Sequence, residues 1–501
     1  MNEALDSYLR AAADGADHRR AVRAAAERLA HDPWTVVKVA GQLARARLAV
    51  ADRDFGLTSQ LVPVGVDDPR AIARVAAGQP FPELDPRSRR ARGAFDTPMD
   101  YARRVVRATR RAAEGQVRVG LDTACGTGAF LLAMAEAGVA EVWGTDLDAV
   151  ALEVARVAVP SAVLVREDAL RHGPLVDITC GNPPFVPPER QDKELRSELR
   201  RRFPWLRGRF DLVVPFAATA VDRVRPGGAA GLVLPFPSLV QPYGAVLRRR
   251  WVHRHRISTL VGPLPFPGAA VEVGVVVLIA DRGPDRLPEG LSVEEVLRLD
   301  NVPLDPVLRS GDVDIVEHFR ARSVRLGDLA LVDTGLVAHG PEGGKAELIY
   351  DAPGSGRVPY ADAREFFSGR RRWLDYRPKA MHRAKSPELF EGPKLVIQRL
   401  RGKGPIKAAV DRSGIYVGHT CTVVVPRDPR LDLDRLCELV TSPVVDGIIR
   451  IERGQRLDLY PRDVASIPVP LDWLRNPRLP AEVAAGLSPA QVQRLRAVAP
   501  R

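Results

Sequence analysis

Apolar and polar positions alternate in three different ways along this chain, and the changes divide it into regions. Residues 1–90 repeat apolar residues every three or four positions, as in "WTVVKVAGQLARARLAV", which predicts amphipathic helices. Residues 91–285 alternate short β-rich runs with helical runs, which predicts a mainly parallel sheet covered by helices. Residues 326–475 contain short apolar runs such as "KLVIQRL" and "GIYVGHTCTVVVP" between glycine and proline turns, which indicates an α+β module.

The remaining segments are expected to connect or close these regions. Residues 286–325 contain "NVPLDP" and are predicted to be a linker. Residues 476–501 form a C-terminal tail in which Ser488 is predicted to cap a short closing helix. The predicted fold class is therefore α/β, with a mainly parallel-sheet domain between a helical N-terminal region and an α+β domain.

A glycine-rich turn, "DTACGTG", ends the first predicted strand of the α/β region and precedes a helix. Gly126 and Gly128 allow the backbone to approach a ligand closely, and the helix N-terminus offers backbone N–H donors. The spacing is neither GxGxxG nor GxxxxGK[ST], so it favours neither a dinucleotide nor a P-loop phosphate site.

Acidic residues end the next two predicted strands. Asp146 follows the glycine turn by about twenty residues, which is where a carboxylate binds ribose hydroxyls in nucleotide-binding sheets. The alternative is that Asp146 caps the following helix, although Asp148 is the better candidate for that cap. Asp168 ends the third strand and is suited to accept a hydrogen bond from an adenine amino group. Together these strand ends predict a site for an adenosine-like ligand.

The fourth predicted strand ends in the rigid corner "NPPF". Pro183 and Pro184 have a fixed φ and no N–H, so the carbonyl groups of the corner are left to accept hydrogen bonds. Asn182 adds a side-chain carbonyl, and Phe185 adds a flat apolar face. Two acceptors beside an aromatic ring can hold a planar –NH₂ group and direct its lone pair toward an electrophile. The alternative is a structural turn with a core phenylalanine.

"DTACGTG" followed by "NPPF" resembles the class I S-adenosylmethionine-dependent amino-methyltransferases. "GAFDTPMDYARRVV", residues 93–106, lies before this core, and that order is similar to the gamma group of adenine-N6 DNA methyltransferases, which the TaqI methyltransferase typifies. The resemblance implies a Rossmann-like class I methyltransferase domain, S-adenosyl-L-methionine as cofactor, and site-specific transfer to N6 of an adenine flipped out of duplex DNA.

The same resemblance implies roles for single residues. The cofactor would be bound by Thr97, Asp122, Thr123, Ala124, Gly126, Gly128, Asp146, Asp168 and Asn182. The catalytic residues would be Asn182, Pro183 and Phe185. Phe185 and Phe266 would stack on the target base. The sequence departs from the usual pattern at Thr123, where the family usually has proline, and at Phe185, where tyrosine is commoner.

The distribution of charge along the chain indicates a polyanionic partner. The formal net charge is +12, and residues 366–412 contain 13 Lys or Arg against 4 Asp or Glu. This segment lies in residues 326–475, which resemble the DNA-specificity domain of TaqI-type enzymes, so duplex DNA is the expected partner. The alternative is a solvated basic surface. The candidate DNA-binding residues are Arg370, Arg371, Arg372, Lys379, Arg383, Lys394, Arg399, Arg401 and Lys403.

Other features exclude some classes of protein. No run of eighteen apolar residues predicts a membrane span, and the N-terminal residues do not resemble a signal peptide. Four cysteines without a CxxC spacing predict neither a metal site nor disulfides, and they fit a reducing cytoplasm.

Several functional alternatives stay open. The planar amine could belong to cytosine N4, to RNA or to a glutamine side chain instead of adenine. The chain could also be an inactive methyltransferase-fold subunit that only binds DNA. A cognate restriction or phage-defence protein is a possible partner of the predicted restriction-modification enzyme.

Overall fold

The structure is a computed structural model that describes residues 97–171, 173–266, 272–283, 287–338, 348–400, 404–454 and 458–499. The helices predicted for residues 1–90 lie outside the described residues. The chain divides into a first unit, which ends at Leu297 and also includes Val302–Pro306, and a second unit made of Arg298–Asn301 and Val307–Arg501.

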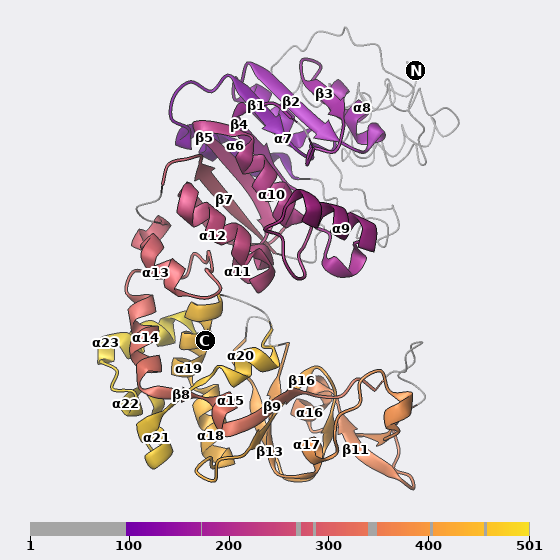
Figure 1. Cartoon of the computed structure of the whole chain (residues 1–501), viewed down its shortest axis with the longest axis vertical. Helices are drawn as coiled ribbons and strands as arrows, with labels where there is room; N and C mark the ends of the chain where they lie inside the picture. Colours follow the sequence, from indigo (N-terminus) through magenta and orange to yellow (C-terminus); the bar gives the residue numbers. More distant parts are fainter. Residues whose placement is uncertain are drawn as a thin grey trace, which may run out of the picture. The chain divides into compact units, whose positions relative to one another are not determined.

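The first unit alternates strands and helices, as the sequence predicts (Figure 1). Its elements are α6 (Met99–Ala112), β1 (Val119–Asp122), α7 (Ala129–Glu136), β2 (Glu141–Asp146), α8 (Ala149–Ala158), β3 (Val163–Arg166), β4 (Val176–Gly181), α9 (Lys193–Arg202), α10 (Val213–Asp222), β5 (Val224–Pro235), α11 (Phe236–Val240), α12 (Ala245–Arg254), β6 (Arg256–Leu264), β7 (Val273–Ile279) and α13 (Val293–Arg298), whose last residue belongs to the second unit.

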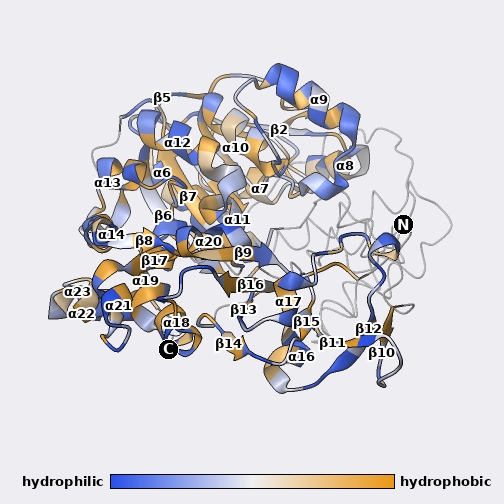
Figure 2. Ribbon diagram, turned by 60° about the horizontal axis from the view of Figure 1, so that its bottom comes forward, coloured by the Kyte–Doolittle hydropathy of each residue, from blue (hydrophilic) through white to orange (hydrophobic). Residues whose placement is uncertain are grey.

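The strands form one seven-stranded sheet in the order β3-β2-β1-β4-β5-β7-β6. The pairs from β3 to β5 are parallel, whereas β7 runs antiparallel to both β5 and β6. Every residue of β7 is buried, while the edge strands β3 and β6 are only partly buried. Figure 2 shows that β7 is also hydrophobic, in contrast to the surface helix α9, which is mostly hydrophilic. The predicted fold class is confirmed.

Successive residues of β4 show that helices cover both faces of the sheet. Thr179 Oγ1 donates to the carbonyl of Ala220 on α10 at 3.0 Å. The next residue, Cys180, contacts Thr109 of α6. Because successive side chains of a strand point to opposite faces, α6 and α10 lie on opposite sides of β4. Helices therefore flank this central strand on both faces of the sheet.

A buried arginine holds residues 302–306 against the first unit. Arg248 of α12 is fully buried, and its guanidinium donates to the carbonyl groups of Val302 at 2.8 Å and Gln241 at 2.9 Å. The Leu304 N–H also donates to the Leu239 carbonyl at 2.9 Å. Carbonyl acceptors thus satisfy a charge that would otherwise be costly to bury. The segment 286–325, expected to be a linker, contributes to both units and contains α13 and another helix, α14.

The second unit is an α+β unit. Its elements are α14 (Asp312–Ala321), β8 (Ser323–Arg325), α15 (Leu326–Leu329), β9 (Ala330–Thr334), β10 (Ile349–Tyr350), β11 (Arg357–Ala361), α16 (Ala363–Ser368), β12 (Arg372–Asp375), α17 (Glu388–Glu391), β13 (Lys394–Gln398), β14 (Ala408–Asp411), β15 (Tyr416–Val417), β16 (Cys421–Pro426), α18 (Leu433–Thr441), α19 (Pro443–Arg453), α20 (Pro461–Ala465), β17 (Pro468–Pro470), α21 (Leu471–Arg475), α22 (Ala481–Ala484) and α23 (Pro489–Val498).

Two four-stranded sheets organise the second unit. Their orders are β14-β13-β16-β9 and β10-β12-β11-β15, and β17 pairs with β8 separately. The strands predicted from "KLVIQRL" and "GIYVGHTCTVVVP" are present as β13 and as β15 with β16. The closing helix α23 begins with the predicted cap, because Ser488 Oγ accepts a hydrogen bond from the Gln491 N–H in a capping box.

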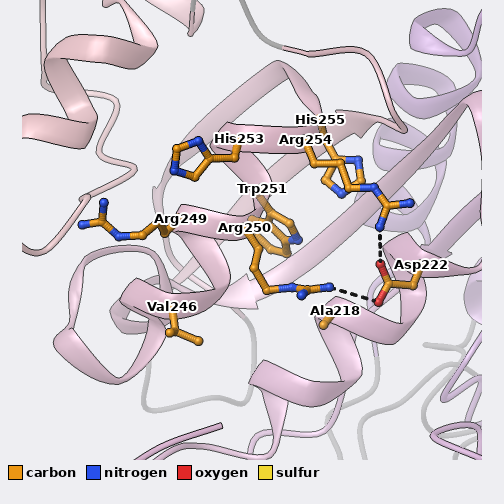
Figure 3. A pocket seen from close by; sticks show the side chains of 9 residues that line it. All are labelled: Ala218, Asp222, Val246, Arg249, Arg250, Trp251, His253, Arg254 and His255. Atoms are coloured by element: carbon orange, nitrogen blue, oxygen red, sulfur yellow. Dashed lines mark ion pairs between the residues drawn. The ribbon is translucent and has the colours of Figure 1, made fainter. Parts of the chain in front are cut away.

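A hollow of about 400 Å³ opens in the first unit between α10 and α12 (Figure 3). Asp222 ends α10 just before β5 and lies 3.6 Å from a nitrogen of Arg250 and 3.7 Å from one of Arg254. Arg254 also pairs with Asp281. These residues lie where β5 starts, so the hollow is at the edge of the sheet opposite to the carboxyl ends of the parallel strands. Its charged side chains form a structural ion-pair network.

His255 is the buried histidine beside this hollow. Its Nδ1 accepts a hydrogen bond from the backbone N–H of Asp281 at 3.1 Å, which requires that nitrogen to be unprotonated. Burial, reinforced by the positive charge of Arg254 and opposed by Asp281, lowers the pKa of His255 from its ordinary value of 6.5 to about 4. The native protein therefore keeps His255 neutral over a range in which the unfolded chain protonates it.

This difference predicts a pH-dependent stability. A depressed folded-state pKa gives full stabilisation above pH 6.5 that is lost as the pH falls toward 4. We expect the free energy of unfolding of the wild type to fall by about 2–3 kcal/mol more than that of His255→Asn across this window. Chemical denaturation at several pH values measures it. His253→Gln, which removes an exposed histidine near the end of α12, is the control and should keep the wild-type slope.

Candidate active site

The carboxyl ends of the parallel strands bring the predicted site residues of the first unit to one edge. β1 lies between β2 and β4, so Asp122 at the end of β1 is flanked by the ends of both neighbours. A Cβ added to Gly181, the last residue of β4, would lie 2.7 Å from Asp122 Oδ1. The absence of a side chain at Gly181 therefore allows the Asp122 carboxylate to lie directly against the start of the Asn-Pro-Pro-Phe corner.

Asp146 joins the glycine-rich turn to the end of β2. Its Oδ2 accepts a hydrogen bond from the Gly126 N–H at 2.8 Å, and its Oδ1 accepts one from the Asp148 N–H at 2.9 Å. Gly126 and Gly128 have φ of 51° and 91°, in the left-handed region that glycine adopts without strain. A Cβ on Gly126 would meet no atom within 4 Å, so the space beside the turn is open.

Two acidic groups lie at this edge, the buried Asp122 and the partly buried Asp146. Burial raises the pKa of Asp122 to about 7, and the nearby charge of Asp146 raises it further, while a hydrogen bond from the Ala124 N–H opposes both. Burial also raises the pKa of Asp146, against the hydrogen bonds from Asp148 and Gly126. A ligand that brings positive charge and hydroxyl donors would reduce the cost of keeping both carboxylates ionised.

The start of α6 connects the corner with the segment that carries Phe266. The Asn182 Nδ2 donates to Thr97 Oγ1 at 3.2 Å, immediately before α6 begins. One turn later, Tyr101 meets the Phe266 ring edge to face at 5.7 Å between centroids, and its hydroxyl donates to the Pro265 carbonyl at 2.7 Å. The structure thus brings together Thr97 and Asn182, which lie 85 positions apart. Phe185 and Phe266 are both buried.

Asp168 has charged partners that the sequence did not predict. Its Oδ1 accepts the Leu170 N–H at 3.1 Å, and its Oδ2 lies 3.2 Å from Arg202 of α9 and 3.5 Å from Arg171. Glu198 of α9 pairs with the same two arginines. An adenine amino group would therefore have to share a carboxylate that two guanidinium groups already contact.

The residues at this edge fit the cofactor that the sequence resemblance implies. S-adenosylmethionine has a sulfonium, an ammonium group and two ribose hydroxyls, which can interact favourably with a buried and a partly buried carboxylate beside an open glycine turn. Asp122 lies nearest the corner, while Asp146 lies at the end of the neighbouring strand. The roles assigned to all of the predicted site residues, including Thr123, Ala124, Gly128 and Pro183, stay predictions.

In the second unit, several of the predicted DNA-binding side chains are exposed. Arg371 and Lys379 are exposed, and Arg383 is exposed although its backbone pairs with Val337. Arg370 is exposed and lies 3.6 Å from Asp351. These four residues are accessible to a polyanion.

The other predicted DNA-binding residues behave differently. Lys394 is fully buried, and its ammonium group donates to Asp411 and to the Phe390 carbonyl, so its assignment to a DNA surface is wrong. Arg372 is three-quarters buried and lies 2.8 Å from Glu365. The Arg399 guanidinium lies over the Tyr460 ring at 5.5 Å. Arg401 and Lys403 lie outside the described residues.

Among the described residues, no helix is long and apolar enough to span a bilayer. Over the same residues, no three His, Cys, Asp or Glu side chains gather as metal ligands would.

Comparison with known sequences finds similarity in the α/β part of the chain. Residues 121–180 match a protein family described as "Methyltransferase domain". The type II methyltransferase M.PaeR7I of Pseudomonas aeruginosa is 29% identical over 91 residues, which cover 18% of this chain and 16% of that protein. The type II methyltransferase M.XhoI of Xanthomonas vasicola is 38% identical over 88 residues, which cover 17% of this chain and 16% of that protein. Each alignment thus spans well under two thirds of the relative.

Comparison with solved structures extends over both units. The type IIL restriction-modification enzyme MmeI in complex with DNA aligns with a TM-score of 0.54 at 13% identity, over 94% of this chain and 87% of that chain. The DrdV–DNA complex aligns with a TM-score of 0.51 at 11% identity, over 81% of this chain and 61% of that chain. At these identities the likeness concerns the fold alone. The first unit of this chain therefore has the Rossmann-like fold of the class I methyltransferases, and an α+β unit follows it.

Proposed function

We propose that this protein is a site-specific DNA methyltransferase that transfers a methyl group from S-adenosylmethionine to N6 of an adenine extruded from duplex DNA. The observation that carries the proposal is the convergence of Asp122, Asp146 and the Asn182 corner at one edge of a class I methyltransferase sheet. The similarity to two type II methyltransferases supports DNA as the substrate and modification, within a restriction or phage-defence system, as the role.

The corner supplies the chemistry for a planar amine. Asn182 and Pro183 each offer a carbonyl oxygen to one N–H of the adenine amino group, and Phe185 offers a stacking face. Holding both N–H bonds turns the nitrogen lone pair out of the ring plane and aims it at the methyl donor. The alkylated amine is acidic and loses its proton to solvent, so no strong side-chain base is needed.

The cofactor site completes the reaction. When bound, S-adenosylmethionine supplies an electrophilic methyl group on a sulfonium. Asp146 accepts from the ribose hydroxyls, Asp122 faces the positively charged end, and Gly126 leaves the turn free of a side chain. Asn182 also donates to Thr97, which fixes the plane of its amide and hence the direction of its oxygen.

Base extrusion requires additional binding energy from DNA. Unpairing and unstacking an adenine costs a few kcal/mol, and stacking on aromatic rings returns about 1–3 kcal/mol per base. Phe185 and Phe266 are the proposed stacking residues. The exposed cations Arg370, Arg371 and Lys379 of the second unit are proposed to contact phosphates and contribute the remainder.

The main alternatives concern the accepting amine. Cytosine N4 and RNA bases present planar amines that the same corner accommodates. Tritium transfer to duplex DNA and RNA, followed by mass spectrometry of the nucleosides, separates them. N6-methyladenine in DNA supports the proposal, whereas N4-methylcytosine or labelled RNA contradicts it.

Asn182→Ala should abolish most of the transfer while cofactor binding is largely kept. We expect kcat to fall roughly 10²–10³-fold, the cost of removing one oriented polar group from a reacting centre. Steady-state transfer and calorimetric titration of S-adenosylmethionine measure the two quantities. Thr97→Ala is the comparison variant, since it removes the hydroxyl that accepts from Asn182 but keeps the amide, and it should lose less activity.

Asp146→Ala should weaken cofactor binding. The variant loses two backbone hydrogen bonds and the proposed ribose contact, so we expect Kd for S-adenosylmethionine to rise roughly 10- to 100-fold, or about 1–3 kcal/mol. Asp177→Ala is a matched control, because Asp177 Oδ2 accepts the N–H groups of Arg118 and Val119 at 2.9 Å each at the opposite edge of the sheet. Equal weakening in both variants would argue against a cofactor role for Asp146.

The triple variant Arg370→Ala, Arg371→Ala, Lys379→Ala should weaken duplex binding at all sequences. Each lost phosphate contact should reduce the slope of log affinity against log salt by about one. Fluorescence anisotropy over a salt series measures it. The control removes the same charge from exposed residues outside segment 366–412, namely Arg435, Arg475 and Arg478. Equal losses in both triple variants would reject a specific DNA surface.

A further inference from the structure

The Asn-Pro-Pro-Phe corner has almost no backbone donors of its own. The sequence from Asn182 to Glu189 reads NPPFVPPE, so four of the six residues between these two are prolines without an N–H. Of those six, only Phe185 and Val186 can donate. This segment follows β4 and has no regular secondary structure until the short turn at Pro188–Arg190. The position of the corner therefore depends on groups from elsewhere in the chain.

Two buried side chains, Asp211 and Gln191, form hydrogen bonds with the backbone of Val186. Its N–H donates to Asp211 Oδ1 at 3.1 Å. Its carbonyl accepts from Gln191 Nε2 at 2.7 Å and from the Leu212 N–H at 3.0 Å. Asp211 and Gln191 are both more than nine-tenths buried. The N–H and the carbonyl of Val186, the residue after Phe185, are thus held by Gln191, Asp211 and Leu212.

The same side chains connect the corner to the core of the first unit. Asp211 Oδ1 also accepts the Val213 N–H at 3.0 Å, at the start of α10. Gln191 Nε2 also donates to the Phe210 carbonyl at 2.9 Å. Helix α10 is hydrogen-bonded to β4 through Thr179. The corner follows β4 directly and hydrogen bonds connect both to α10, so the position of each depends on the other two.

We propose that Asp211 and Gln191 are positioning residues that set the height and direction of the corner, and through it the target-base contacts of Asn182 and Phe185. This inference rests on the proposed function. Neither side chain is assigned a contact with cofactor or base. Their effect acts through Val186, which Phe185 precedes directly, and a displacement of a reacting group by about 1 Å can cost 10²-fold in rate.

The chemistry of the two residues supports this role. A single carboxylate oxygen accepts two N–H groups from different segments, which fixes their separation more tightly than two independent bonds. Burial raises the pKa of Asp211 to about 6, against the hydrogen bonds from Val213 and Val186, so keeping this carboxylate ionised in the fold is costly. A turn that needed only stability could use a neutral acceptor there.

The test compares Asp211→Ala with Asp211→Asn and Asp177→Ala. Transfer to unmethylated mixed-sequence duplex DNA gives kcat and KM, titration gives Kd for S-adenosylmethionine, and thermal unfolding gives Tm. We expect Asp211→Ala to lower kcat roughly 10²-fold with KM for the cofactor unchanged. Asp211→Asn keeps an oxygen for both N–H groups and should recover most of the activity. Asp177→Ala loses two comparable bonds to backbone N–H groups, and an ion pair with Arg225, at the other edge; it should lower Tm without lowering kcat.

Gln191→Met keeps the test decisive if Asp211→Ala does not fold. It removes both donated hydrogen bonds at nearly constant volume, and it should lower kcat in the same way. Wild-type kcat in a folded Asp211→Ala or Gln191→Met variant would overturn this inference alone. A wild type that labels no DNA would overturn the proposed function and this inference together.

Discussion

The geometry of this protein's candidate site depends on a shortage of backbone hydrogen-bond donors. The segment Asn-Pro-Pro-Phe-Val-Pro-Pro after β4 can neither continue the strand's hydrogen bonding nor begin a regular helix, because four of its residues have no N–H. Rigid φ angles alone would give the corner a shape but not a location. The location comes from Thr97 on one side and from Asp211 and Gln191 on the other, and each of them acts through a hydrogen bond.

The acidic side chains at the same edge are a second constraint on the candidate site. Parallel strands bring Asp122 and Asp146 to neighbouring positions, where the charge of Asp146 raises the cost of ionising Asp122. Such an arrangement is poor for stability and suits a positively charged ligand. At the opposite edge, Asp222 and Asp281 are paired with arginines, so carboxylates there are neutralised by the chain itself. The sheet thus separates the edge that carries the candidate site from an edge whose carboxylates are paired with arginines.

Local patterns in the sequence predicted the fold and the strand ends, because strand alternation, glycine turns and the Ser488 cap depend on neighbouring residues. The contacts of Asp168 with Arg202 and of Val186 with Asp211 could not be predicted, since they join elements that only the folded chain brings together. Counting charges also misled at Lys394. Segment 366–412 is basic overall, but β13 is a central strand, and its lysine is paired internally with Asp411.

The start of α6 contacts two of the proposed site residues, through Thr97 just before the helix to Asn182 and through Tyr101 to Phe266. Asn182 and Phe266 come from distant parts of the chain, yet both contact the same short segment, residues 97–101. Their positions are therefore mechanically coupled, and a substitution that shifts this segment would displace both residues together. A change in the spacing of these two residues on this scaffold would begin at that segment.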